Sequence, residues 1–212
     1  GDNSYGQLGN DKYCRYSLVE RVIGIQDADS VSAGDLFSIV QKNDGTEMSW
    51  GNDWANQLGD GNNECRSIPD IVPNVTGVSK TSAGGNHTLA LKNDGTVTAW
   101  GDNWSGQLGI GEYSYEPAPV QVANLSDVKD ISAGSGHSLA VLNNGTVWSW
   151  GGNWYGQLGN GSTENSNIPV QIQNFTNIAT VAGGSYHSLA LKNDGTVWAW
   201  GANWSGQLGN GT

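Results

Sequence analysis

The chain has 212 residues, with nine Lys and Arg against twenty Asp and Glu, and its formal net charge is −11. This acidic balance, with no cluster of basic residues, excludes the usual footprint of a nucleic-acid binder or of a protein that binds anionic membranes. Apolar runs are only a few residues long, so we expect no membrane insertion. The 32 glycines and 10 tryptophans exclude a disordered composition and favour short strands joined by tight turns.

The first predicted element is an isolated outer strand over residues 17–23. After it, stretches of about fifty residues repeat one order of elements, most clearly in the third unit. There, VKDISAG predicts a strand, and HSLAVL and TVWSWG predict a hairpin joined by NNGT, because Asn-Gly and Asp-Gly pairs accept the positive φ angles of a two-residue turn. A looser fourth strand follows the hairpin, as in SIPDIV, PAPVQV and NIPVQI, whose prolines suit a sheet edge.

Several residue types recur with a step of fifty. The recurring positions are Trp50, Trp100, Trp150 and Trp200; Gly45, Gly95, Gly145 and Gly195; Gly34, Gly84, Gly134 and Gly184; and His87, His137 and His187. The sequence therefore predicts an all-β fold, a β-propeller of four-stranded antiparallel blades with about four repeats. We expect a single repeat domain over residues 1–212, with units of approximately 1–50, 51–100, 101–150 and 151–200 and the start of a fifth at 201–212. We also expect the tryptophans at the ends of the returning strands to be buried between blades.

The stretch AGSGHSLAVLNNGTVWSWGGNWYGQLGNG resembles a repeat of the regulator of chromosome condensation family, with its Ala-Gly-x-x-His-Ser, turn-glycine, Trp-Gly and Gly-Gln-Leu-Gly elements in order. The resemblance covers essentially the whole chain. It implies a β-propeller, typically of seven blades, and no single activity, since members include an exchange factor, a photoreceptor, parts of ubiquitin ligases and a secreted inhibitor of β-lactamase. No tryptophan precedes the repeated histidine, which argues against light sensing. In composition the chain is closest to bacterial secreted or surface members.

Four periods cannot supply seven blades. Residues 1–12 and 201–212 are two copies of one connection, and a closed ring needs only one of them. We therefore expect part of a larger ring, or an open array that associates head to tail with further copies of itself.

The sequence contains no pattern that indicates catalysis, a cofactor or a metal ion. Each histidine begins a strand beside small residues, so we expect its ring to bond local backbone and support the blade. No second ligand accompanies Cys14 or Cys65 at zinc-site spacing, and these cysteines either form a disulfide between neighbouring units or remain free thiols.

A second set of aromatic residues lies inside the glycine-rich connection, four residues after each strand tryptophan. This set contains Trp54, Trp104, Trp154 and Trp204, with Tyr5 in the first unit. Two interpretations are open: each ring caps the groove between blades, or the rings face solvent on one side of the propeller and bind a protein or a glycan. The predicted function is a non-catalytic protein-interaction scaffold that binds a partner protein through these loops, and the acidic charge favours a basic partner. Alternatives are a structural, self-assembling surface protein and an enzyme inhibitor of the β-lactamase-inhibitor type.

Overall fold

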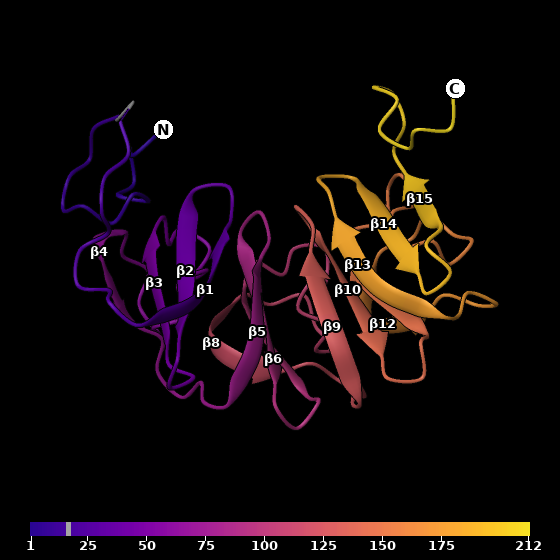
Figure 1. Ribbon diagram of the computed structural model, residues 1–212, viewed down its shortest axis with the longest axis horizontal. Coiled ribbons are helices and arrows are strands. Elements are labelled where there is room, and N and C mark those ends of the chain that lie inside the picture. The colour runs from indigo at the N-terminus through magenta and orange to yellow at the C-terminus, as the bar shows by residue number, and fades with distance from the viewer. Residues whose placement is uncertain (16–17) are drawn as a thin grey trace.

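A computed structural model describes residues 1–15 and 18–212 of the chain. The described residues form strands, turns and bends. Among them, no helix is long and apolar enough to cross a membrane. The strands are arranged in four sheets that follow one another in chain order along an arc, with the two chain ends at opposite ends of it (Figure 1).

Each sheet begins with a short strand followed by a tight hairpin. Sheet 1 contains β1 (Ala28–Ala33), β2 (Phe37–Lys42), β3 (Glu47–Gly51) and β4 (Arg66–Ile71). Sheet 2 contains β5 (Val78–Ala83), β6 (His87–Lys92), β7 (Val97–Gly101) and β8 (Glu116–Gln121). Sheet 3 contains β9 (Val128–Ala133), β10 (His137–Leu142), β11 (Val147–Gly151) and β12 (Ser166–Gln171). Sheet 4 contains β13 (Ile178–Gly183), β14 (His187–Lys192) and β15 (Val197–Gly201).

The pairing within the sheets is antiparallel throughout, in the predicted order. The turn between β6 and β7 has three residues and not the predicted two, because Gly95 N–H donates to the Lys92 carbonyl and Lys92 N–H donates to the Thr96 carbonyl. Gly95, with a φ of +80°, takes the positive angle alone, which explains why glycine stands there. The fourth strand pairs through an irregular register and lies at the outer edge, where Pro117 of β8 needs no ladder donor. The isolated strand predicted over residues 17–23 falls partly outside the described residues, and residues 18–23 form no strand.

Neighbouring sheets are held together by their facing apolar side chains. Leu89 and Val97 of sheet 2 pack against Ile131 and Trp150 of sheet 3, and all four are fully buried. The Trp150 ring also donates its Nε1–H to the carbonyl of Gln107, 2.8 Å away, in the loop that leaves sheet 2. The strand tryptophan is therefore buried between its own sheet and the preceding sheet, as predicted, and it also bonds the preceding sheet's connecting loop.

Candidate partner-binding face

The Gly-Gln-Leu-Gly segments form long loops, which we call the connecting loops, between the third and fourth strands of sheets 1 to 3. Loop 1 spans residues 52–65, loop 2 spans 102–115 and loop 3 spans 152–165; related copies lie at residues 1–12 and 202–212. The loops lie at the same edge of the sheets, because each leaves the C-terminal end of a third strand.

A buried asparagine fixes the conformation of the connecting loop. In loop 2, the Asn103 side chain is fully buried, accepts the Leu108 N–H at 3.0 Å and donates to the Glu112 carbonyl at 2.9 Å. The backbone N–H of Trp104 donates to the Asp102 carboxylate, 3.0 Å away. These local hydrogen bonds order the loop without using the tryptophan ring, so the ring is free to project outward.

The connecting-loop tryptophans are exposed. Their exposed fractions are 69% for Trp54, 72% for Trp104, 58% for Trp154 and 62% for Trp204. By contrast, Trp100 on the preceding strand is 0% exposed. Of the two interpretations left open by the sequence, the structure therefore favours rings that face solvent. We call the edge of the sheets that carries these four rings the aromatic face.

Most of these rings contact a tyrosine edge-on. Tyr5 contacts Trp54 with centroids 5.1 Å apart, and Tyr155 contacts Trp204 at 4.8 Å. Tyr186, from the β13–β14 turn, also contacts Trp204 at 5.8 Å, so that turn lies at the same edge as the connecting loops. Trp104 contacts a tyrosine of its own loop with centroids 6.3 Å apart. Edge-on aromatic pairs contribute free energy in addition to that of the buried area, so the tyrosines hold these exposed tryptophan rings in place.

Trp154 has a different environment. It lines a pocket of about 390 Å³ together with Tyr113 of loop 2 and with Thr163, Glu164 and Asn165 of its own loop. In the part of the chain that the structure describes, no ring pair includes Trp154.

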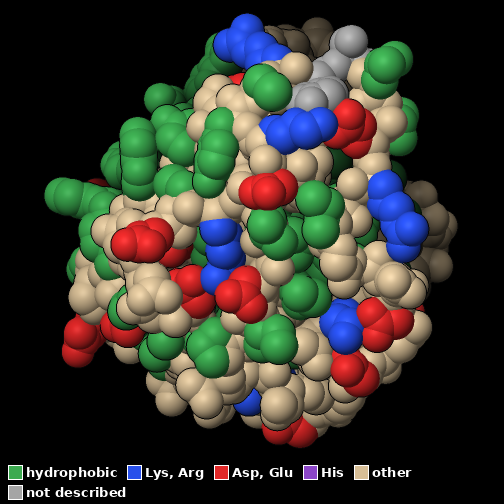
Figure 2. Space-filling view, turned by 90° about the vertical axis from the view of Figure 1, so that its left-hand side faces the viewer, with side chains coloured by type: hydrophobic (Ala, Val, Ile, Leu, Met, Phe, Trp, Pro, Cys, Tyr) green, Lys and Arg blue, Asp and Glu red, His purple; other side chains and the backbone are tan. Residues whose placement is uncertain are grey.

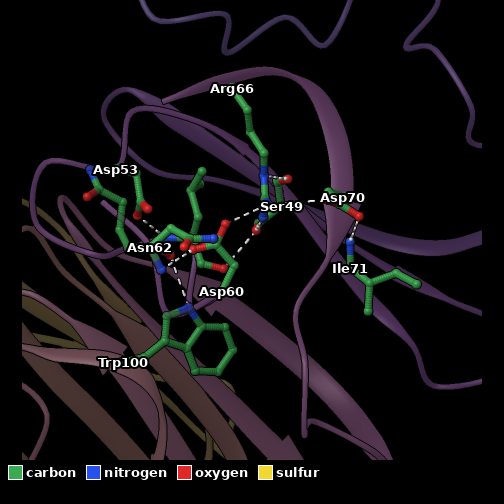
Figure 3. Close-up of polar contacts among 10 residues, drawn as sticks. Ser49, Asp53, Asp60, Asn62, Arg66, Asp70, Ile71 and Trp100 are labelled. Atoms are coloured by element: carbon green, nitrogen blue, oxygen red, sulfur yellow. Dashed lines mark hydrogen bonds and ion pairs between the residues drawn. The ribbon is translucent and has the colours of Figure 1, made fainter. Parts of the chain in front are cut away.

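Loop 1 is distinguished by a polar cluster around Arg66 (Figure 3). The guanidinium forms an ion pair with Asp60 at 2.7 Å and donates to the Ser49 hydroxyl at 2.8 Å and to the Ser49 carbonyl at 3.1 Å. Asp53 takes the place of the buried asparagine, and burial raises the pKa of its carboxyl to about 7. The end of the molecule formed by sheet 1 shows Lys and Arg interspersed with Asp and Glu (Figure 2).

Comparison with known families agrees with this architecture. The profile of the regulator of chromosome condensation (RCC1) repeat matches residues 44–91, 94–141 and 144–191, and a second RCC1 profile matches residues 78–107, 128–157 and 178–207. These matches cover more than half of the chain. The chain belongs to the RCC1 repeat family. No curated protein sequence matches it.

Solved RCC1-type propellers have the same fold. Human WBSCR16 is 26% identical with a TM-score of 0.86, and covers 100% of this chain and 58% of its own. Prp20p from Saccharomyces cerevisiae, described with its binding to Gsp1p and histones, is 24% identical with a TM-score of 0.79 over 87% of this chain and 48% of its own. Yeast RCC1 (Prp20) bound to Kap60 is 25% identical with a TM-score of 0.72 over 82% and 43%. The chain thus spans about half the length of these propellers.

The histidines of the RCC1 repeats support the fold in a way that differs from the prediction. His87 is fully buried and its ring packs on Gly84, but its Nε2 lies 3.0 Å from the hydroxyl of Ser138 in the next sheet, and among the described residues its Nδ1 has no hydrogen-bond partner. That hydroxyl donates to the Gln107 carbonyl at 2.7 Å, so it accepts from the imidazole N–H. Burial, with a smaller contribution from the nearby His137, lowers the pKa of His87 to about 3, and burial lowers the pKa of His137 to about 4, so both rings are neutral. The histidine thus joins adjacent sheets.

The two cysteines are free thiols, Cys14 exposed and Cys65 partly buried, so the disulfide alternative is not formed. The sequence prediction named Tyr5 on this face but missed its other tyrosines, Tyr113, Tyr115, Tyr155 and Tyr186. Tyr155 directly follows a connecting-loop tryptophan, as Tyr5 follows the serine at that place in the first unit, and this shared position was an available signal. Tyr186 has no aromatic counterpart at the equivalent positions 36, 86 and 136, so the period does not reveal it, and Tyr113 has a counterpart only in Tyr13.

Proposed function

We propose that residues 1–212 form one repeat domain that acts as a non-catalytic protein-interaction scaffold and binds a partner protein through the aromatic face. The observation that carries this proposal is the exposure of four equivalent tryptophans on loops whose conformation is fixed by buried hydrogen bonds. Yeast Prp20p, an RCC1-type propeller, is described as binding Gsp1p and histones, and a complex with Kap60 is known, which supports the same class of function for this chain.

The energetics favour binding through these rings. A tryptophan that loses on the order of 100 Å² of exposed apolar surface contributes about 2.5 kcal/mol before the entropic costs of association. Those costs are smaller for a face whose loops are already ordered. Tryptophan and tyrosine are also the residues enriched at binding hot spots. Four such rings on neighbouring blades would therefore supply the apolar centre of an interface, with the surrounding loops adding the rest of its area.

The charge of the chain favours a basic partner. The net charge of −11 gives a negative potential that accelerates the approach of a positively charged surface. We therefore expect the association rate to fall with increasing ionic strength, while the dissociation rate depends mainly on the rings.

The test is quantitative capture of proteins from the source organism with three immobilised forms: the wild type, Trp104→Ala with Trp154→Ala, and a control with Asn93→Ala and Asn193→Ala in the turns at the opposite edge of the sheets. We expect a captured protein that is retained by the control, lost from the tryptophan variant and recovered as a direct binder with purified components. The melting temperature of the tryptophan variant should be unchanged. Equal capture by all three forms would reject the proposal.

Head-to-tail self-association is a second candidate function, favoured by the exposed face of sheet 4. Val197 is 67% exposed, whereas its counterparts Val97 and Val147 are fully buried against the following sheet. At the other end, an apolar pocket of about 600 Å³ is lined by Val22, Val31 and their neighbours. We expect mass to increase with concentration in sedimentation equilibrium and Val197→Glu to abolish the increase; a concentration-independent mass would exclude this candidate.

A further inference from the structure

We propose that the pocket between Trp154 and Tyr113 binds a lysine or arginine side chain of the partner, an assignment that rests on the proposed function of the aromatic face. Trp154 is the one connecting-loop tryptophan without a ring contact among the described residues. A space of about 390 Å³ lies beside it, and Asn165 in its lining is equivalent to Tyr115, the ring that contacts Trp104. The pocket is therefore an open site between two aromatic walls.

The walls of the pocket have the chemistry that a cation prefers. Trp154 is 58% exposed and Tyr113 is 52% exposed, so both present ring surface to an incoming group. A cation within about 6 Å of the centroid of an aromatic ring is attracted by the ring quadrupole, and tryptophan gives the strongest effect. The chain itself contains this contact elsewhere, because the ammonium of Lys192 lies 4.9 Å from the Trp198 ring centroid.

Glu164 supplies a carboxylate at the same pocket. Its backbone is fixed, because its N–H donates to the Ser162 hydroxyl at 2.9 Å and its carbonyl accepts from the Asn153 amide at 3.0 Å. No ion pair within the described part of the chain involves its carboxylate. A positively charged side chain would therefore find an unpaired counter-charge on an ordered loop, next to two rings.

The surrounding loops are acidic and carry no basic residue. Residues 102–116 and 152–166 contain Asp102, Glu112, Glu116 and Glu164 but no Lys, Arg or His. In loop 1, by contrast, the carboxylate of Asp60 is already paired with Arg66. At the pocket itself Glu164 is the acidic residue of the lining, and neither of the two loops supplies a cation to neutralise it, which favours a cationic group over a neutral sugar that could also stack on the rings.

The test uses the peptide acetyl-Gly-Gly-Lys-Gly-Gly-amide, its arginine counterpart and its uncharged norleucine counterpart. Binding is followed through the indole N–H resonances of the full chain in ¹H–¹⁵N NMR spectra, with the Trp154 resonance assigned from the Trp154→Ala variant. We expect the lysine and arginine peptides to shift the Trp154 indole in a saturable way and the norleucine peptide to leave it unchanged. Glu164→Gln, which keeps the shape of the side chain, should raise the dissociation constant of the lysine peptide about fivefold or more, and Tyr113→Ala should do the same.

The matched control is Asp94→Asn, which removes one carboxylate from an exposed turn at the opposite edge of the sheets and should leave the dissociation constant of the lysine peptide unchanged. Equal shifts from the norleucine peptide, no effect of Glu164→Gln, or saturation of Trp154 by a neutral oligosaccharide in place of the charged peptides would overturn the assignment. Failure of the peptides while the tryptophan variant still loses its captured protein would reject the cation pocket and leave the proposed function in place.

Discussion

Glu47 gives the sharpest test of the energetics of the blade stack. It is fully buried at the start of β3, where the next three units have valine at the equivalent positions 97, 147 and 197. One carboxylate oxygen accepts the Thr81 hydroxyl at 2.6 Å, and the other, Oε2, has no hydrogen-bond partner among the described residues. Burial raises the pKa of this carboxyl to about 7, because the charged form loses its hydration.

The raised pKa predicts a pH-dependent cost. In the unfolded chain Glu47 ionises near its ordinary pKa of 4.5. Its stabilising contribution is therefore fully present below about pH 4.5 and is lost as the pH rises through 7, by roughly 2–3 kcal/mol in total. Replacing Glu47 by valine removes this loss, at the cost of about 1 kcal/mol for the hydrogen bond with Thr81.

We therefore compare the free energy of unfolding of Glu47→Val with that of the wild type at pH 5 and at pH 8. The difference between the two proteins should shift in favour of Glu47→Val by about 2 kcal/mol from pH 5 to pH 8. The assay is urea unfolding followed by tryptophan fluorescence at both pH values, and comparing the two proteins cancels the titration of all other groups. Glu47→Gln is the matched control, because it cannot ionise but keeps the shape and an acceptor for Thr81; it should show the same relative gain. If the difference between wild type and Glu47→Val is the same at pH 5 and pH 8, the carboxyl does not carry a raised pKa and the reasoning is wrong.

Three further predictions concern the other buried and exposed positions. Burial lowers the pKa of His87 to about 3, so the stabilising contribution of the neutral ring is present above pH 6.5 and is lost as the pH falls toward 3. His87→Phe, which copies Phe37 of the first unit, should therefore unfold at a lower pH than the wild type in an acid titration. An unchanged midpoint of that titration would contradict this prediction. Trp100→Ala should cost about 3–5 kcal/mol in urea unfolding and Trp104→Ala less than about 0.5 kcal/mol, and comparable losses would show that both rings pack in the core. Gly59→Ala should lower the melting temperature more than Gly209→Ala does, although both glycines have positive φ. A Cβ at Gly59 would lie 2.5 Å from the Trp100 ring nitrogen, whereas a Cβ at Gly209 would have no neighbouring atom within 4 Å. Equal shifts in melting temperature would refute this steric account.

The strand order could be predicted from sequence because the signals are local. The Asp-Gly and Asn-Gly turns fix the position of each hairpin, and the prolines identify the edge strand, as at Pro117 in β8. The step of fifty then predicts that equivalent strands stack, as the burial of Trp100 and Trp150 confirms. None of these conclusions requires knowledge of a contact between residues distant in sequence.

Interactions between sheets could not be predicted in the same way. The Ser138 hydroxyl that accepts from His87 is 51 positions away, and nothing near the histidine indicates it. Glu47 stands at a core position where the next units have valine, and its buried carboxylate accepts a hydrogen bond from Thr81 in the neighbouring sheet. A sequence period states which positions are equivalent, but it does not state which side chain of the next unit each one meets.

The direction of the connecting-loop tryptophans depends on the loop and not on the rings. Trp100 and Trp104 are the same residue type four positions apart, yet one is fully buried and the other is 72% exposed. The difference follows from Asn103, which satisfies the loop backbone from inside, and from the strand tryptophan, which already occupies the groove between sheets and bonds the Gln57 carbonyl at 3.0 Å. With the groove filled and the loop ordered, a second tryptophan has no buried position left to take. A large apolar side chain kept exposed in this way on each blade adds nothing to the core, and this exposure is the basis of the proposal that the rings contact another molecule.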